Sequence, residues 1–232
     1  MWRAGGLLSL LLFTWACAVP PAGAPHTRPA PPLPQDTAYL NPLEKEIMRE
    51  HNLARRAPRR YAALLEKQRK YYRGNIVERP DHPPFSTQEG VKAVDEAIAF
   101  LQRVPPLAPL EPSRGLSLSA RDHVEDQGPK GDTGHIGSDY SQLRHRADRY
   151  GSWRRIVAEN IAYGPTNARD VVMGLIVDDG VPDRGHRKTI FNPFLHVIGV
   201  HCGYHKTYDV MCAMNYSEGF IDSPTNQLPD ER

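Results

Sequence analysis

Two cysteines near the C-terminus constrain the fold more than any other feature of this sequence. Cys202 and Cys212 lie at equal distances from Thr207. A hairpin with its loop around Thr207 would place them opposite each other, because facing Cβ atoms on paired strands lie about 5 Å apart. Residues 197–204 and 210–216 alternate well enough to form its strands. The sequence therefore predicts an antiparallel hairpin closed by a disulfide, with two buried free thiols as the alternative.

Residues 1–18 have the pattern of a secretory signal peptide. They contain Arg3, a short apolar stretch and the cleavage pattern Ala16-Cys17-Ala18, and Ala22-Gly23-Ala24 is a second candidate cleavage site. The apolar stretch is too short to span a membrane, which takes about 20 residues. Removal of this segment leaves two cysteines, an even number that favours a disulfide in an exported chain. We expect a secreted or periplasmic protein without a transmembrane span; retention of the segment as an anchor, or a lipid anchor on Cys17, are the alternatives.

Proline, with 22 of the 232 residues, divides the rest of the chain. Residues 19–42 predict an extended proline-rich linker, residues 43–220 the folded domain, and residues 221–232 a C-terminal tail. Apolar spacing predicts helices at residues 43–57, 61–72, 86–101, 119–127 and after Thr166 or Asn167, and a strand at residues 156–163. Ser86, in a capping box with Glu89, and Ser119 are expected to cap the third and fourth helices. Helices flanking a small, mainly antiparallel sheet predict an α+β domain.

Charge and motif content exclude several classes of function. The formal net charge is +2 and the basic residues are scattered, whereas duplex DNA requires a concentrated basic surface, so no nucleic-acid partner is expected. Charged residues at 24% and apolar residues at 40% are typical of a globular chain. The sequence contains no H-E-x-x-H, G-x-S-x-G, P-loop or Gly-rich dinucleotide motif. The sequence therefore gives no direct indication that the protein belongs to the enzyme classes that depend on those motifs.

Four polar residues stand at the edges of the expected elements, where side chains can converge on a cleft. They are His135, Glu159, Asp178 and His186. Two neutral imidazoles with one or two carboxylates suit zinc or a similar divalent cation, and they also suit acid and base catalysis. Spacing alone does not establish that they converge, so four independent structural roles are the alternative. For Glu159 that role would be to accept backbone N–H bonds from the preceding loop.

Five other polar residues are expected to act structurally. Asn52 and Arg55 would tie the first helix to neighbouring chain. Asp139 and Arg146 would form an ion pair that fixes a loop, and His123 would lie at the edge of the core instead of serving as a fifth ligand.

Several short motifs occur in a recognisable order. They are H-N-L-A-R at 51–55, A-x-x-H at 120–123, G-H-I-G-S-D at 134–139, A-E-N-I-A-Y-G at 158–164, G-H-R at 185–187 and I-G-V at 198–200. In this order the chain resembles the CAP superfamily of cysteine-rich secretory, antigen 5 and pathogenesis-related 1 proteins, in particular its small exported bacterial (SCP-like) members. The resemblance covers residues 43–56 and 116–216, so residues 57–115 are an insertion.

The resemblance implies a CAP-type three-layer α-β-α sandwich with a central, mainly antiparallel sheet. It also implies a cleft lined by two histidines and two acidic residues. His135, Glu159 and His186 match three of these positions. Asp178 is the nearest match for the fourth, and Asp179 is the alternative, because the tryptophan and glutamate of the family's W-x-x-E motif are replaced here. The insertion would cover or narrow the cleft.

Three kinds of function are expected from these features. In the first, the protein is a non-enzymatic binding module: His135 and His186 hold zinc or another divalent cation, or a small ligand, while Glu159 and Asp178 supply charge or orient the imidazoles. Lipid or sterol binding on apolar walls is a variant of this function. The second is metal-assisted hydrolysis with Glu159 as general base. The third is a purely structural interaction domain, and the sequence identifies neither the ligand nor a protein partner.

Overall fold

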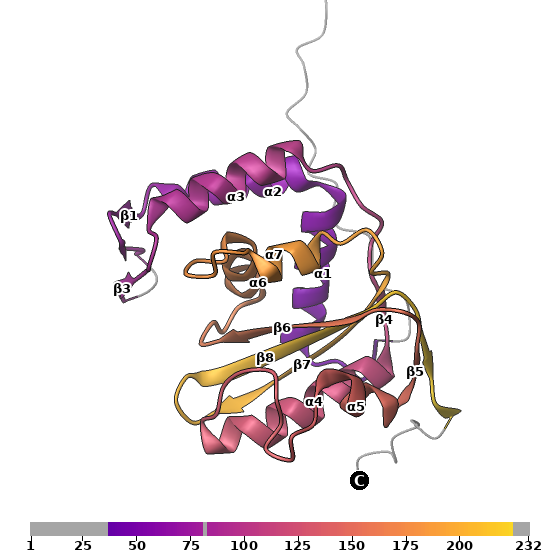
Figure 1. Ribbon diagram of the computed structural model, residues 1–232. Coiled ribbons are helices and arrows are strands. Elements are labelled where there is room, and N and C mark those ends of the chain that lie inside the picture. Colours follow the sequence, from indigo (N-terminus) through magenta and orange to yellow (C-terminus); the bar gives the residue numbers. More distant parts are fainter. Residues whose placement is uncertain (1–36, 81–82, 225–232) are drawn as a thin grey trace, which may run out of the picture. The chain divides into compact units, whose positions relative to one another are not determined.

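The computed structural model describes residues 37–80 and 83–224 (Figure 1). The predicted signal peptide, most of the predicted linker and most of the tail lie outside these residues. Within them, no helix is both long enough and apolar enough to cross a membrane.

The helices are α1 (Pro42–Arg56), α2 (Pro58–Arg69), α3 (Val91–Arg103), α4 (Arg114–Gln127), the 3-10 helix η1 (Gly128–Lys130), α5 (Leu143–Asp148), α6 (Ala168–Val177) and α7 (Gly185–Ile190). The strands are β1 (Tyr72–Arg73), β2 (Ile76–Val77), β3 (Phe85–Ser86), β4 (Glu111–Pro112), β5 (Gly151–Trp153), β6 (Val157–Tyr163), β7 (Val197–His205), β8 (Asp209–Ser217) and β9 (Phe220–Asp222).

The central sheet has the strand order β4-β7-β8-β6. β7 and β8 form a hairpin and β6 pairs antiparallel with β8, whereas the short β4 pairs with β7 in parallel. Cys202 faces Cys212 in the hairpin register, and a disulfide joins them. Thr207 lies in the turn between the two strands. The predicted hairpin and its disulfide are therefore confirmed, and β6 is left at the edge of the sheet.

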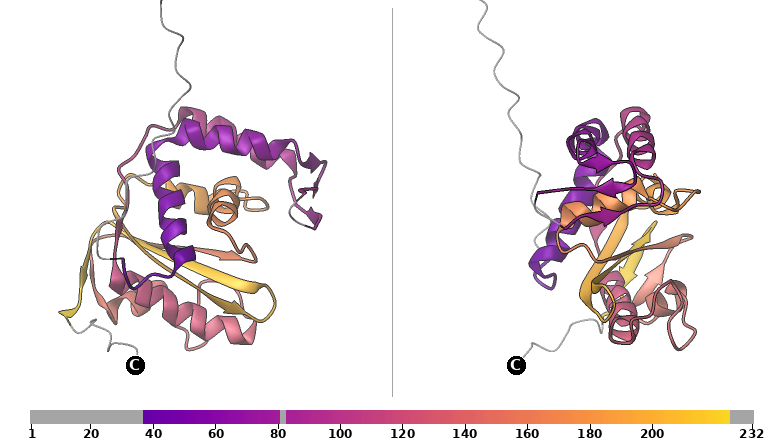
Figure 2. Two further views of the ribbon diagram at one scale, coloured as in Figure 1. Left: turned by 180° about the vertical axis from the view of Figure 1, so that it is seen from behind. Right: turned by 90° about the vertical axis from the view of Figure 1, so that its left-hand side faces the viewer.

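Helices cover both faces of this sheet (Figures 1 and 2). α4 and α5 lie on one face, and α1, α6 and α7 lie on the other. The main apolar core lies on the α1 and α6 side, and a smaller cluster lies under α4. The smaller cluster consists of Ala120, Val124, Ile161, Met211 and Ala213. The expected α+β class and the three-layer sandwich with a mainly antiparallel sheet are confirmed.

α4 approaches β7 closely, and this approach depends on a glycine. A Cβ atom on Gly199 would lie 2.1 Å from the backbone nitrogen of Ser117 and 2.5 Å from the Cβ atom of Leu116. Ser117 Oγ accepts a hydrogen bond of 3.0 Å from the backbone N–H of Val200. The I-G-V motif therefore fixes α4 against the sheet, and α4 in turn supports part of the candidate site.

The insertion adds a helical hairpin, α2 and α3, outside the α1 and α6 layer (Figure 1). A small antiparallel sheet of order β1-β2-β3 lies between these two helices in sequence. Tyr61 and Leu65 of α2 and Val94 and Leu101 of α3 are buried in the main core cluster. The insertion is thus a part of the folded core instead of a detached lid.

Two of the five expected helices begin as predicted, the first within one residue of Leu43 and the last directly after Asn167. Asn41 and Glu44 form a capping box at the beginning of α1, and Asn167 caps α6 by accepting a hydrogen bond from the backbone N–H of Asp170. The caps satisfy backbone donors that the first turn of a helix leaves unpaired.

The expected caps of the third and fourth helices are wrong. Ser86 lies in β3, and α3 begins after Gly90, whose φ of +64° is accessible to glycine without strain. α4 is capped by Ser113, so it begins earlier than predicted and Ser119 is buried inside it. Ser113 follows Pro112 of β4, and the prediction missed it because the signal of a two-residue strand is too short to show where the helix starts.

Asn52 and Arg55 have the structural roles expected of them. The amide of Asn52 makes two hydrogen bonds with the backbone of Leu110, at 3.0 and 2.7 Å. The buried guanidinium of Arg55 donates to four backbone carbonyls, those of Ala108, Ile190, Asn192 and Leu195. These two residues hold α1 against the segments that lead into β4 and β7.

Candidate functional site

The four candidate residues form two pairs, each consisting of a buried carboxylate and a histidine. In the first pair, His135 Nδ1 lies 2.9 Å from Glu159 Oε1. In the second, His186 Nδ1 lies 2.6 Å from Asp178 Oδ1. The side chains of Glu159 and Asp178 are 3% and 2% exposed, whereas those of His135 and His186 are 53% and 27% exposed. Each imidazole is therefore held through Nδ1, and its Nε2 is the ring nitrogen left for an outside ligand.

The two pairs lie on opposite sides of β6, the edge strand. Glu159 is on the face that looks toward α4 and α5, because its partners are His135, in the loop after α4, and Arg146 of α5. The next residue, Asn160, points to the other face, as consecutive strand residues must. There its side-chain amide donates to the backbone carbonyl of His186 at 3.1 Å. The structure thus brings the four residues to one strand without merging them into one cluster.

The Glu159 carboxylate is compensated by side chains. Arg146 Nη2 lies 2.7 Å from Glu159 Oε2, and the side chain of Arg146 is only 1% exposed. Burial by itself would raise the pKa of Glu159, but the hydrogen bond from His135 and the charge of Arg146 outweigh it, so the pKa of Glu159 is lowered. The predicted pairing of Asp139 with Arg146 is wrong: Asp139 is exposed and pairs with Arg149, while the buried guanidinium pairs with the buried acid.

The loop that carries His135 is fixed through three successive carbonyl groups. His123 Nε2 donates to the carbonyl of Gly134 at 2.8 Å, and Gln127 Nε2 donates to the carbonyl of Ile136 at 2.8 Å. Arg146 Nη1 donates to the carbonyl of His135 itself at 3.3 Å. Burial lowers the pKa of His123, so this ring is neutral and carries its proton on Nε2.

His123 and Gln127 therefore position the first pair, a role that sequence reasoning missed. His123 is buried, as expected of a residue that packs and does not bind a ligand. The sequence feature that could have revealed this role is the four-residue spacing of the two side chains, which places them on the same face of α4.

The Asp178 carboxylate is compensated mainly by backbone. Asp178 ends α6 in the left-handed conformation, with φ of +58°. Its Oδ2 accepts from the backbone N–H groups of His186 at 2.9 Å and Arg187 at 3.3 Å, while Oδ1 holds the His186 ring. Asp179, the alternative fourth residue, instead accepts from the backbone N–H groups of Gln88 and Glu89 in the insertion. The structure places Asp178, and not Asp179, beside His186.

A buried chain of hydrogen bonds connects the second pair to α1. His51 Nδ1 donates to the carbonyl of Ile47 at 2.9 Å, and His51 Nε2 lies 2.8 Å from Tyr216 Oη. Burial lowers the pKa of His51 to about 4 and raises the pKa of Tyr216, so both groups are neutral. Asn160, which binds the His186 carbonyl, also lies 3.4 Å from Tyr216 Oη. The asparagine of the A-E-N motif thus links the edge strand to the core, which sequence reasoning did not detect.

The insertion holds the segment between Asp178 and His186. Arg184, in the left-handed conformation, donates to Glu89 at 2.6 Å and to Glu96 at 2.6 Å. The hydrogen bond with Arg184 lowers the pKa of Glu89 to about 2. Glu96 also accepts from Arg187, one residue after His186. Two acids of the insertion therefore fix the turn that presents the second histidine.

The arrangement limits the metal chemistry that is available. Over residues 37–80 and 83–224, no three His, Cys, Asp or Glu side chains are grouped closely enough to hold a metal ion together. The carboxylate and imidazole pairs nevertheless match the way in which metal-binding histidines are usually oriented by an acid. His135 and His186 could therefore supply two nitrogen ligands, with the acids acting behind them.

Comparison with known proteins gives one family match. The sequence profile of the cysteine-rich secretory protein family, CAP, matches residues 49–216. No curated protein matches the chain.

Two solved structures are similar to parts of it. An outer surface protein from Borrelia burgdorferi has 17% identity and a TM-score of 0.41, over 48% of this chain and 78% of the other. An extracellular protein containing an SCP domain from Bacillus anthracis has 21% identity and a TM-score of 0.38, over 55% of this chain and 37% of the other. Both TM-scores are below 0.5, so the family assignment depends on the profile match alone.

Proposed function

Since the chain belongs to the cysteine-rich secretory protein family, CAP, we propose that it is an exported, non-enzymatic binding module whose ligand-binding groups are His135 and His186. The ligand is a divalent cation such as Zn²⁺, bound at the free edge of β6 by the Nε2 atoms of the two imidazoles, which would reach it from opposite sides of the strand. When bound, the cation would supply positive charge and open coordination positions for a small ligand.

One observation carries this proposal: each imidazole bears a buried carboxylate on Nδ1. A carboxylate at that position fixes the ring orientation and makes the opposite nitrogen a better donor. Glu159 and Asp178 are too buried, and too fully engaged by their own partners, to act as ligands themselves. The remaining coordination positions would be filled by water or by the ligand.

The geometry favours binding over hydrolysis. A general base requires a pKa near the working pH and access to the water that it activates. Glu159 has a lowered pKa, is buried, and already accepts from His135 and Arg146. These properties suit a carboxylate that orients an imidazole more than one that accepts a proton during a reaction.

A zinc titration by calorimetry tests the proposal. We expect one ion per chain in the wild type, weaker binding in His135→Ala and in His186→Ala, and loss of binding in the double variant. His196→Ala is the matched control, because His196 is an exposed histidine whose Nδ1 contacts a backbone carbonyl instead of an acid. An unchanged isotherm in the double variant would contradict the proposal. So would two ions per chain, with each single substitution removing one of them.

Export is supported by the disulfide between Cys202 and Cys212, because such bonds persist in oxidising compartments. It also agrees with the signal peptide predicted over residues 1–18. The intact mass of protein recovered from the growth medium or periplasm tests it, with a chain that begins at Val19 as the expected result. A retained Met1 or a lipidated Cys17 would contradict cleavage after Ala18.

A further inference from the structure

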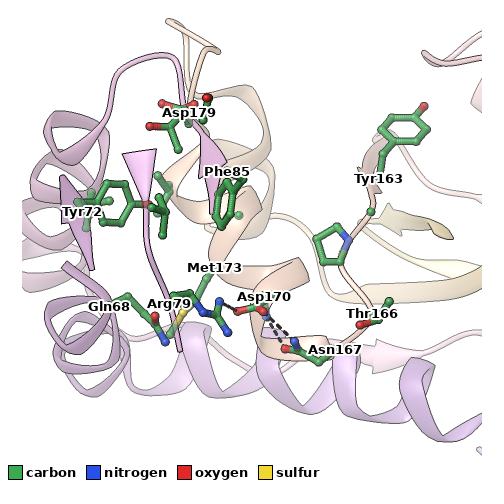
Figure 3. Close-up of a pocket in the computed structure, with 18 of the residues that line it drawn as sticks. Gln68, Tyr72, Arg79, Phe85, Tyr163, Thr166, Asn167, Asp170, Met173 and Asp179 are labelled. Atoms are coloured by element: carbon green, nitrogen blue, oxygen red, sulfur yellow. Dashed lines mark hydrogen bonds and ion pairs between the residues drawn. The ribbon is translucent and has the colours of Figure 1, made fainter. Parts of the chain in front are cut away.

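A cavity of about 660 Å³ lies between the insertion and the rest of the domain (Figure 3). Tyr72 and Phe85 of the insertion stand on one side, and Tyr163 at the end of β6 stands on the other. Tyr208 of the β7–β8 turn also lines it, and Met173 of α6 contributes to its floor. None of the four histidine and acid residues lines this cavity. Its volume and its mixture of apolar and polar walls are those of small-molecule sites in general.

A glycine in the middle of α6 leaves the cavity floor open. Gly174 lies inside the helix, where glycine is less favourable than alanine by about 1 kcal/mol. A Cβ atom built on it would meet no atom of residues 37–80 and 83–224 within 4 Å, the backbone of its own helix aside, so close packing among them does not explain the glycine. Gly174 also lines the cavity. The missing side chain therefore leaves space in the cavity that no described residue fills, and a ligand could occupy this space.

The described residues that line the cavity carry a net negative charge. Among the described residues, three aspartates and one arginine line the cavity. Arg79 forms an ion pair of 2.7 Å with Asp170, so these two charges compensate each other. Asp179 and Asp209 remain, and Asp209 is exposed at the start of β8, directly after the hairpin turn, with φ of +63°. The lining thus has an excess of negative charge at a place where a ligand could contact it.

Aromatic side chains on both sides strengthen the preference for a cation. The faces of Tyr and Phe rings attract ammonium groups, and the attraction increases when water is excluded. Tyr163 and Tyr208 lie together, with ring centroids 5.5 Å apart, on the side that also bears Asp209. Phe85 and Met173 supply apolar surface on the opposite wall and the floor.

We propose that this cavity is a binding site for an organic cation with an apolar body, such as an alkylammonium compound. The apolar part would lie over Gly174 and against Met173 and Phe85. The ammonium group would lie near Tyr163, Tyr208 and Asp209. The site is separate from the histidine pairs, so it does not depend on the metal proposal. Because one wall comes from the insertion, the ligand would bridge the insertion and the CAP core.

Three probes of similar size separate charge from apolar contact. Calorimetry on the full chain would compare 4-phenylbutyltrimethylammonium, 4-phenylbutanol and 5-phenylpentanoate. We expect the cation to bind at least about tenfold more tightly than the alcohol, and the carboxylate to bind most weakly. Equal or tighter binding of the alcohol or the carboxylate would overturn the choice of a cation. Failure of the cation to bind would overturn the site.

Substitutions locate the binding. Gly174→Leu fills the floor, and we expect it to weaken cation binding by at least about tenfold while the melting temperature stays equal or rises, since leucine favours helix over glycine. Gly174→Ala should have a smaller effect on binding. Wild-type affinity in a folded Gly174→Leu variant would place the ligand elsewhere and overturn the proposal.

A charge variant gives an independent measurement should Gly174→Leu not fold. Asp209→Asn removes one negative charge, and asparagine tolerates the left-handed conformation at this position. It should weaken binding of the cation and leave binding of the alcohol unchanged. Asp132→Asn, at an exposed aspartate that does not line the cavity, is the control. Equal effects of the two substitutions would contradict a role for Asp209.

Discussion

The two buried carboxylates of the candidate site are compensated in different ways. Glu159 depends on the positive charge of Arg146, which is itself almost completely buried. Asp178 depends on backbone N–H groups at the start of α7 and on His186. A buried ion pair is sensitive to removal of one member, because the other charge remains in a poorly solvated place. We therefore expect Glu159 to matter for stability as well as for the orientation of His135.

Glu159→Gln should lower the free energy of unfolding at neutral pH by about 3 kcal/mol, because the charge of Arg146 loses its counter-charge. The pKa of Glu159 is lowered in the folded protein. Its contribution to stability is therefore fully present above the unfolded glutamate value of about 4.3, and it is lost as the pH falls from there through the folded pKa. The measurement is urea unfolding at neutral pH and across the acidic range.

Glu125→Gln is the matched control, since Glu125 is an exposed glutamate of α4 that pairs with Arg121 at 3.8 Å. It should change stability little, as surface ion pairs generally contribute little. If Glu159→Gln were as stable as the control and lost stability in acid as steeply as wild type, the assigned role of Glu159 would be wrong.

At the level of single residues, the sequence indicated which side chains lie close together only where a short connection along the chain limits the possible partners. Asp178 follows the last residue of α6 and His186 is the second residue of α7, so the short connection keeps them close, and their side chains pair. The partner of Arg146 was predicted wrongly, because Asp139 is near it in sequence but exposed, whereas Glu159, with which Arg146 pairs, is buried. Burial depends on tertiary packing that local sequence does not contain.

Elements with long or symmetrical patterns were predicted, and short ones were not. The hairpin followed from two cysteines placed equally about Thr207, and α1 followed from its apolar spacing. The strands β1, β2 and β3 are only two residues long, so no alternation is available to reveal them. The start of α3 was misplaced because Glu89, expected in its capping box, binds Arg184 and the backbone of Gly180 instead.

The hairpin should depend measurably on its disulfide. The bond joins residues 10 apart in sequence, and the loop-entropy relation gives a stabilisation of about 2 to 3 kcal/mol for a loop of this length. The double variant Cys202→Ala, Cys212→Ala should therefore unfold with a free energy lower by about that amount in urea. A reducing agent should destabilise the wild type toward the same value and leave the variant unaffected. Equal stability of the two proteins without reductant would contradict this account.

Over residues 37–80 and 83–224, the insertion and the CAP elements share one core. Leu101 of α3 and Tyr61 of α2 belong to the same apolar cluster as Ile176 of α6 and Val200 of β7. Ion pairs of Arg184 with Glu96 of α3 and with Glu89, just before α3, add a second connection. The sequence indicated an insertion but not this sharing, because the register of α2 and α3 against the core depends on contacts far apart in the chain.

Because the core is shared, a destabilising substitution in the insertion should also lower the stability of the part of the domain that lies away from the insertion. Leu101→Ala removes a fully buried side chain and should lower the free energy of unfolding by about 2 to 5 kcal/mol. Once residues 1–18 are removed, Trp153 of β5 is the only tryptophan, and its indole N–H donates to Asp148. Its fluorescence therefore reports on a region away from the insertion.

We expect the fluorescence of Trp153 and the far-ultraviolet circular dichroism of the Leu101→Ala variant to change at one and the same urea concentration, lower than in wild type. Coincident transitions are the mark of a single cooperative unit. Phe194→Ala is the control, since Phe194 is a 62% exposed apolar residue outside the insertion, and it should leave the midpoint nearly unchanged. If circular dichroism lost part of its signal at low urea while Trp153 kept the wild-type midpoint, α2 and α3 would unfold on their own. The cavity beside Gly174 would then lose one wall before the domain unfolds, so the same experiment also measures how firmly that wall is held.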